Sequence, residues 1–161
     1  MKIACLGGGP AGLYFAISMK LRDPSHDVTV IERNRADDTF GWGVVLSDET
    51  LANLHANDPE SADSIKEYFA YWDDIALVHQ GQRLVSSGHG FCGIGRKRLL
   101  LLLQARAAEL GVTLQFETDI EDIDALCAAH DLVVAADGVN SRVRAHFDAA
   151  FKPEIDRRAC K

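Results

Sequence analysis

Apolar and polar positions alternate in distinct blocks along the start of the chain. Residues 2–6 form a short β-rich run that stops at consecutive glycines, and residues 10–21 repeat apolar side chains at helical spacing. A proline at the first helical position suits this segment, because its missing N–H would have no partner there. Residues 28–31 form a second short apolar run. This order predicts a strand, a helix and a second strand.

The middle of the chain is more polar, and its glycines and weak periodicities predict irregular structure. The clearest signal is a pair of β-rich runs that flank a short polar turn, Gln80-Gly81-Gln82. We expect a long loop over 34–47, a short helix over 48–55, a weak helix over 65–71, and a β-hairpin over 75–79 and 83–86. The hairpin interrupts the strand–helix pattern and indicates an insertion or the first strands of a second sheet.

The last third returns to alternating helices and strands. A leucine-rich helix is expected to stop at Gly111, and apolar runs with helical segments between them follow it. The predicted elements are helices over 96–110, 123–129 and 139–147 and strands over 112–116 and 132–136. The chain is therefore predicted to be α/β with a parallel sheet.

The turn after the first strand carries the first chemical signal. Residues 7–12 read GGGPAG and match G-x-G-x-x-G through Gly7, Gly9 and Gly12. The first glycine permits the tight turn, the second lets a pyrophosphate approach the backbone, and the third lets the helix pack close to the strand. The helix that starts at Pro10 and Ala11 would direct its unpaired N–H groups at the phosphates. The turn is predicted to bind a dinucleotide.

An acidic residue follows at the spacing expected for this motif. Glu32 ends the second predicted strand, about 20 residues after the glycines. Its carboxylate can accept hydrogen bonds from both ribose hydroxyls and would repel a 2′-phosphate, which favours an NAD- or FAD-type adenosine. The alternative is a glycine-rich loop beside a surface glutamate, and the joint fit of strand, turn, helix and acid disfavours it.

A second motif follows the last predicted strand. Residues 132–144 read LVVAADGVNSRVR, which places Asp137 at the carboxyl end of a strand, where open α/β sheets bind ligands. Gly138 permits the turn, and Asn140 or Ser141 could cap the next helix. An ordinary turn and helix cap is an equally good interpretation of this motif alone.

Taken together, the two motifs resemble those of one family of flavoenzymes. GGGPAG with its strand-end glutamate, and ADGVNSRVR, are similar to two fingerprints of the class A FAD-dependent aromatic hydroxylases, typified by p-hydroxybenzoate hydroxylase. The resemblance covers essentially the whole chain. It implies a Rossmann-type FAD-binding parallel sheet with a β-hairpin insertion that begins a second, incomplete substrate sheet, at about residues 70–94. Residues 1–161 would be the N-terminal part of the FAD-binding domain.

The resemblance also assigns site residues. Arg33 follows the glutamate as is common in the family, Arg96 in GRKRL matches a position that reaches FAD, and Asp137 would contact the FAD ribose near the path of NAD(P)H. Trp42 and His89 are candidate substrate contacts, although each could instead be a packed or turn residue. The cofactor-binding residues implied by motifs and resemblance are Gly7, Gly9, Pro10, Ala11, Gly12, Glu32, Arg33, Arg96, Asp137 and Gly138.

The implied activity is that of an FAD- and NAD(P)H-dependent monooxygenase that uses O₂. Residues 40–47, FGWGVVLS, resemble the branch that acts on aryl-CoA esters such as salicylyl-CoA or 2-aminobenzoyl-CoA. The family oxidises its aromatic substrate through a flavin C4a-hydroperoxide, so no catalytic side chain and no metal is expected. Alternatives are another FAD oxidoreductase, disfavoured by the Asp-Gly motif and the lack of C-x-x-C, and a non-catalytic dinucleotide-binding module.

The family's third fingerprint, a Gly-Asp motif, does not occur in the sequence, so we expect an N-terminal piece of a longer enzyme. A net charge of −7 disfavours nucleic acid and anionic membranes as partners. The apolar runs are far shorter than the roughly 18 residues of a membrane span, and no signal peptide is present, which predicts a cytoplasmic protein. The scattered cysteines and histidines lack metal-ligand spacing. The choice between NADH and NADPH and the oligomeric state stay open.

Overall fold

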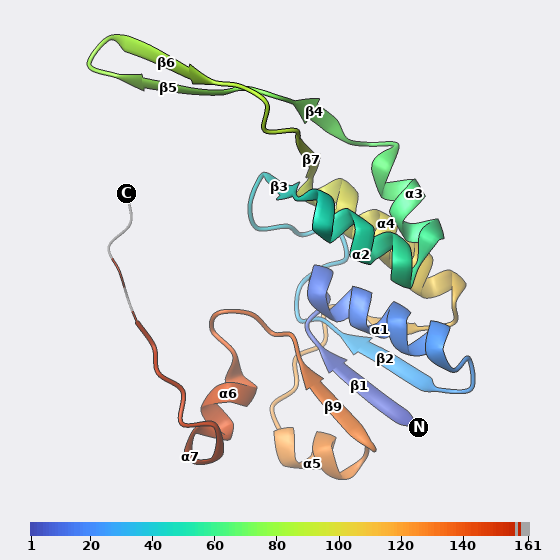
Figure 1. Ribbon diagram of the computed structural model, residues 1–161. Helices are drawn as coiled ribbons and strands as arrows, with labels where there is room; N and C mark the ends of the chain where they lie inside the picture. The colour runs from blue at the N-terminus through green and yellow to red at the C-terminus, as the bar shows by residue number, and fades with distance from the viewer. Residues whose placement is uncertain (157, 159–161) are drawn as a thin grey trace. The chain divides into compact units, whose positions relative to one another are not determined.

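The chain divides into two structural units. The computed structural model describes residues 1–156 and 158 (Figure 1). The first unit combines Met1–Ala36 with Val112–Lys161, and the second is Asp37–Gly111. The glycine turn and the Asp-Gly motif both belong to the first unit, although they lie far apart in the sequence.

The first unit is built on a four-stranded parallel sheet. Its strands are β1 (Lys2–Leu6), β2 (Asp27–Ile31), β8 (Thr113–Gln115) and β9 (Leu132–Ala135). They are arranged in the order β8-β2-β1-β9, and all neighbours are parallel. The sheet therefore grows outward from β1 in one direction through β2 and β8 and then in the other through β9. Such a reversal creates a crevice at the carboxyl ends of the two strands where it occurs, here β1 and β9.

Helices cover both faces of this sheet, and β1 is therefore buried on both sides. Ile3 and Cys5 face helix α1 (Pro10–Arg22), and the Cys5 Sγ lies 3.5 Å from the Gly12 carbonyl oxygen. Ala4 and Leu6 face the opposite way, into a cluster with side chains of α5 (Ile123–Ala128) and α6 (Arg142–His146). A last short helix, α7 (Asp148–Phe151), follows α6. Burial raises the pKa of Cys5 to about 12, so this thiol stays protonated and packs as an apolar group.

The second unit contains helices and two small antiparallel sheets. Strands β3 (Gly43–Leu46), β7 (Phe91–Gly95) and β4 (Ala70–Trp72) form one sheet with β7 at its centre, and β5 (Ile75–His79) pairs with β6 (Gln82–Ser86) as a hairpin. The helices are α2 (Asp48–Asn57), α3 (Pro59–Lys66) and α4 (Arg96–Glu109). All residues of the hairpin are exposed, apolar ones such as Leu77 and Leu84 included. Its role as the start of a substrate-side sheet stays a prediction.

The α/β class, the parallel sheet and the hairpin are confirmed, and three local predictions are wrong. The segment 34–47 is not all loop, because Gly43–Leu46 pairs with β7, and Gly43 lets the Ile94 carbonyl come within 3.1 Å of where a Cβ would stand. The helix expected over 65–71 lies earlier, at Pro59–Lys66, and strand β4 follows it. The helix expected over 139–147 begins only at Arg142. Strand β7 had not been predicted.

The helices and the polar side chains of residues 1–156 and 158 bear on other classes of protein. None of the helices found there is long and apolar enough to cross a membrane. No group of three or more His, Cys, Asp or Glu side chains within the same residues could hold a metal ion. Cys5 and Cys127 are free thiols, the Cys92 Sγ lies 3.4 Å from the Leu46 carbonyl oxygen, and Cys160 lies outside the described residues.

Candidate dinucleotide-binding site

The glycine turn after β1 is packed so closely that two of its glycines cannot carry a side chain. Gly7 donates its N–H to the Ile31 carbonyl at 2.8 Å and has φ +106°. A Cβ on Gly7 would stand 2.2 Å from the Ala136 carbonyl oxygen, and one on Gly12 would stand 2.0 Å from the Gly7 carbonyl oxygen. The turn is therefore wedged between the end of β9 and the first turn of α1, at the crevice described above.

Gly9 differs from these two glycines. Its backbone is extended, with φ −73° and ψ 176°, and a Cβ placed on it would meet no heavy atom within 4 Å. Neither strain nor packing against the described residues requires a glycine here. No side chain among them caps α1, whose first turn begins with Pro10 and Ala11. The open space beside Gly9 and the uncapped N–H groups together fit a pyrophosphate.

Glu32 is held against the same turn by its own carboxylate. Its Oε2 accepts the Gly8 N–H at 2.7 Å, while its Oε1 accepts the Asn34 N–H at 2.8 Å and the Asn34 side-chain amide at 2.7 Å. A carboxylate oxygen has about two lone-pair positions, so Oε2 keeps one for a further donor. One ribose hydroxyl can bind without any contact being lost. Accepting a second hydroxyl would require Asn34 to turn away.

Asp137 lies at the end of β9, beside the glycine turn. The Ala136 N–H bonds the Leu6 carbonyl at 2.7 Å, which extends the β1–β9 pairing up to Asp137. The Asp137 Oδ2 accepts the N–H groups of Arg142 at 2.8 Å and Val143 at 3.4 Å. Its Oδ1 is buried and has no hydrogen-bond partner among the described residues. A buried carboxylate oxygen without a donor is costly, and a ligand hydroxyl would satisfy it.

The Asp-Gly turn is shaped by backbone conformation and capping. Gly138 has φ +83°, a conformation that favours glycine. The Ser141 Oγ accepts the Arg144 N–H at 3.0 Å, so Ser141 and not Asn140 is the cap of α6. Asp137 and Ser141 together account for the N–H groups of the first turn, which explains why this helix starts at Arg142.

Three further candidates belong to the second unit. Arg96 donates its backbone N–H to the Trp42 carbonyl at 3.1 Å, and the Trp42 side chain is 99% exposed. His89 stacks on Phe91 at 5.4 Å between ring centroids and shares a hydrogen bond with Ser86. Trp42 and Arg96 thus meet at one end of the β3–β7 ladder, whereas His89 lies at the other end of β7. Their contacts with cofactor or substrate, and that of the exposed Arg33, stay predictions.

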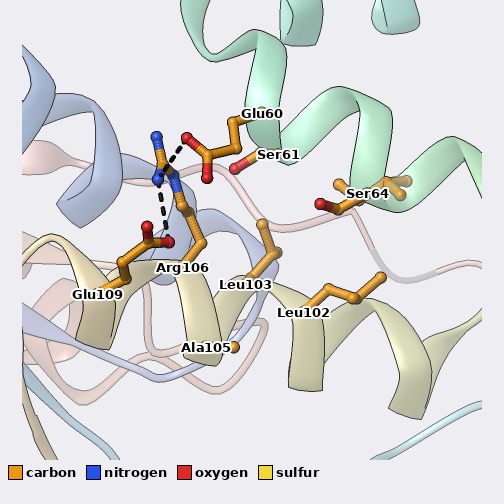
Figure 2. A pocket seen from close by; sticks show the side chains of 9 residues that line it. Glu60, Ser61, Ser64, Leu102, Leu103, Ala105, Arg106 and Glu109 are labelled. Atoms are coloured by element: carbon orange, nitrogen blue, oxygen red, sulfur yellow. Dashed lines mark hydrogen bonds and ion pairs between the residues drawn. The ribbon is translucent and has the colours of Figure 1, made fainter.

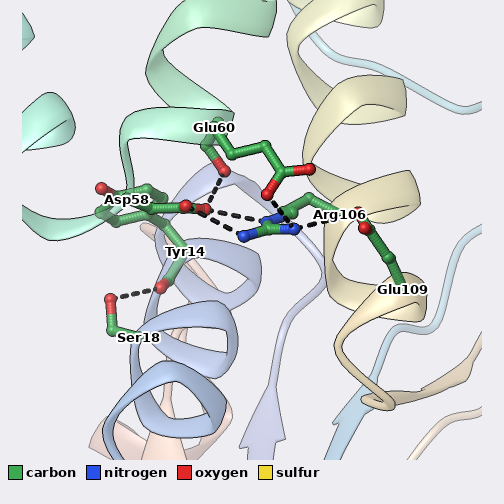
Figure 3. Close-up of polar contacts among 7 residues, drawn as sticks. Tyr14, Ser18, Asp58, Glu60, Arg106 and Glu109 are labelled. Atoms are coloured by element: carbon green, nitrogen blue, oxygen red, sulfur yellow. Dashed lines mark hydrogen bonds and ion pairs between the residues drawn. The ribbon is translucent and has the colours of Figure 1, made fainter.

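A hollow of about 150 Å³ also lies in the second unit, between α3 and α4 (Figure 2). Ile65 and Leu103 are among the residues that line it. Three charged residues also line it, and the Arg106 guanidinium already binds both Glu60 and Glu109 (Figure 3). Because these charges are satisfied internally, we do not assign this hollow to a cofactor.

Two polar residues of the first unit had not been selected from the sequence. Asn34 orients Glu32, and Arg142 donates to Asp137 from its backbone. An asparagine two positions after the strand-end acid is a recognisable local signal, because its amide can return to that carboxylate. The backbone contact of Arg142 depends on the path of the turn and has no signal in residue type.

Comparisons with known proteins agree with this architecture. No protein-family profile matches the chain. Salicyloyl-CoA 5-hydroxylase from a Streptomyces species is 44% identical over 161 residues, which is 100% of this chain and 31% of that protein. Protodeoxyviolaceinate monooxygenase from Chromobacterium violaceum is 35% identical over 97% of this chain and 42% of its own length. A 3-hydroxy-4-methyl-anthranilyl-[aryl-carrier protein] 5-monooxygenase from Streptosporangium sibiricum is 34% identical over 94% of this chain and 42% of its own length.

A solved structure supports the same assignment. The tetrameric form of 2-methyl-3-hydroxypyridine-5-carboxylic acid oxygenase matches with a TM-score of 0.76 and 25% identity, over 89% of this chain and 41% of that chain. The sheet order, the glycine turn and the Asp-Gly turn have the arrangement of a dinucleotide-binding α/β unit, with both turns at the crevice where the sheet order reverses. The chain is a homologue of the aromatic monooxygenases named above, as the sequence motifs predict, and it spans 31–42% of their length.

Proposed function

We propose that this chain is the FAD-adenosine-binding part of a monooxygenase that hydroxylates an aromatic substrate with NAD(P)H and O₂. The observation that carries the proposal is the meeting, at one crevice, of an open glycine turn and a buried carboxylate oxygen without a donor. When bound, FAD supplies the redox and oxygen-transfer chemistry. The side chains of this unit therefore need only to bind and orient it.

Each residue of the first unit has a defined task in this proposal. The backbone at Gly9 and the N–H groups of α1 hold the pyrophosphate. The Glu32 Oε2 accepts a hydrogen bond from a ribose hydroxyl at its remaining lone pair. The Asp137 Oδ1 accepts a hydrogen bond from a hydroxyl of the cofactor, and the backbone of α6 holds this side chain in place. Arg33 and Arg96 add cofactor contacts, and Trp42 and His89 contact the substrate.

The substrate class that we propose is an aryl thioester. One relative is named for a CoA ester and another for an aryl group on a carrier protein, and both names imply an aromatic acyl group attached through a thioester. Salicylyl-CoA and 2-aminobenzoyl-CoA are the first compounds to test. We also propose a cytoplasmic location, which the free thiols of Cys5 and Cys127 support.

Replacing Gly9 by alanine is expected to weaken ADP and FAD binding at least about 10-fold without destabilising the fold. The added methyl group fits the extended backbone and meets no protein atom, but it would occupy the space into which a pyrophosphate must come. Isothermal titration with ADP, quenching of flavin fluorescence and urea unfolding measure these quantities. Unchanged affinity in Gly9→Ala would place the dinucleotide elsewhere.

Binding alone does not separate an enzyme from a passive dinucleotide-binding module. The deciding measurement is NAD(P)H oxidation by the natural full-length gene product with FAD, O₂ and salicylyl-CoA or 2-aminobenzoyl-CoA. Product hydroxylation coupled to that oxidation supports the proposal. A full-length product that binds FAD but neither consumes NAD(P)H nor hydroxylates an aryl thioester would favour the non-catalytic module.

A further inference from the structure

Arg142 contacts two separate parts of the first unit. Its backbone N–H donates to the Asp137 Oδ2 at 2.8 Å. Its guanidinium group donates to the Asp119 carboxylate and, at 3.0 Å, to the Ile120 carbonyl. One residue therefore holds the Asp-Gly turn with its main chain and the segment after β8 with its side chain.

The segment after β8 is joined in turn to the loop that carries Glu32. The Glu117 N–H donates to the Asn34 carbonyl at 3.0 Å, and the Thr118 N–H donates to the Glu32 carbonyl at 3.0 Å. Glu117 has φ +53°, a conformation that a non-glycine residue adopts only when its surroundings hold it there. Residues 117–120 thus form a bridge with one end on the Glu32 loop and the other on the Arg142 side chain.

We propose that Arg142 is a positioning residue that couples the two carboxylates of the dinucleotide site through residues 117–120. This inference rests on the function proposed above. Glu32 and Asp137 follow different strands, and their separation has to match one ligand. The Arg142–Asp119 ion pair fixes the bridge at the Asp137 end, while the two backbone hydrogen bonds fix it at the Glu32 end.

The contacts set the size of the expected effect. Arg142 and Asp119 are about half exposed, with side-chain exposures of 48% and 54%, so water and salt screen their ion pair. The carbonyl of Ile120 adds a charged hydrogen bond to the same guanidinium. Loss of the pair should therefore weaken dinucleotide binding by about 3-fold to 5-fold, and the loss should shrink at high salt.

The test is a double-variant cycle on the whole chain with ADP as the probe. Arg142→Gln, Asp119→Asn and the double variant are titrated with ADP by calorimetry, and each is unfolded in urea. Arg158→Gln is the matched control, because Arg158 pairs with Asp156 in another exposed arginine–aspartate ion pair. Amide exchange at Glu117 and Thr118 reports on the bridge itself without any ligand.

We expect each single variant to weaken ADP binding about 3-fold to 5-fold, the double variant to be no weaker than either, and Arg158→Gln to bind as the parent does. Arg142→Lys should recover part of the affinity, and the Thr118 amide should exchange faster in the Gln and Asn variants. Single variants that lose stability yet keep full ADP affinity when folded would overturn the coupling, as would effects that multiply in the double variant. A parent chain that binds neither ADP nor FAD would instead remove the proposed function, and this inference with it.

Discussion

Replacing Arg106 by methionine is expected to lower the free energy of unfolding of the second unit by about 3–5 kcal/mol. The Asp58 residue is only 2% exposed, and Arg106 binds both of its carboxylate oxygens, Nε to Oδ2 at 3.0 Å and Nη2 to Oδ1 at 3.1 Å (Figure 3). Methionine retains much of the apolar stem but removes both guanidinium donors from this buried carboxylate, which keeps its contacts with Ser61. Removing one partner of a buried pair costs far more than the pair contributes in net terms.

Glu60 provides the matched control for this prediction. It binds the same guanidinium at 2.8 Å, but its side chain is 61% exposed. Glu60→Gln should therefore cost no more than about 1 kcal/mol. Both tryptophans of the chain, Trp42 and Trp72, belong to the second unit, so urea unfolding followed by tryptophan fluorescence reports on it directly. Equal losses in Arg106→Met and Glu60→Gln would contradict the burial argument.

The free energy of unfolding should change with pH in opposite directions in the parent chain and in Arg106→Met. Burial acts to raise the pKa of Asp58, but hydrogen bonds from Arg106 and Ser61 outweigh it and hold the pKa below its usual value. A lowered folded-state pKa stabilises the parent above the unfolded value of about 3.9, and that stability is lost as the pH falls through the folded-state pKa. In Arg106→Met burial would raise this pKa instead, so the variant should gain stability as the pH falls from 7 towards 5.

This ion pair also illustrates what the sequence could not predict. Asp58 and Arg106 are 48 positions apart, and nothing in the pattern around either residue names the other. The same holds for the β3-β7-β4 sheet, since its strands are only three to five residues long and only their mutual pairing makes them strands. Non-local pairing of this kind leaves no periodic signal along the chain.

The arrangement of the candidate dinucleotide site was predictable because its signals are local. The glycine turn and the strand-end acids each follow a strand of the parallel sheet within a few residues, and parallel strands bring their carboxyl ends to one edge. The meeting of these candidate residues at one edge is therefore encoded by short motifs plus one rule of topology. What escaped prediction is the set of hydrogen bonds around the two acids, from Asn34 to Glu32 and from Arg142 to Asp137.

Replacing Gly7 by alanine is expected to destabilise the first unit by about 3 kcal/mol and to abolish measurable ADP binding. Two independent costs add at this position. The φ of +106° is strained for any residue with a side chain, and the new Cβ would stand 2.2 Å from the Ala136 carbonyl oxygen. Relief would require β9 to move away from the end of β1, which separates Asp137 from the turn.

Gly138→Ala separates the cost of backbone strain from the cost of the close approach to Ala136. Gly138 also has a positive φ, of +83°, but a Cβ on it would meet no heavy atom within 4 Å, so only backbone strain of about 1–2 kcal/mol is expected. The first unit contains neither tryptophan, so its stability is followed by far-ultraviolet circular dichroism in urea. If Gly7→Ala unfolds at the same urea concentration as Gly138→Ala, the close approach of β9 contributes nothing, and packing against Ala136 is not what fixes the turn.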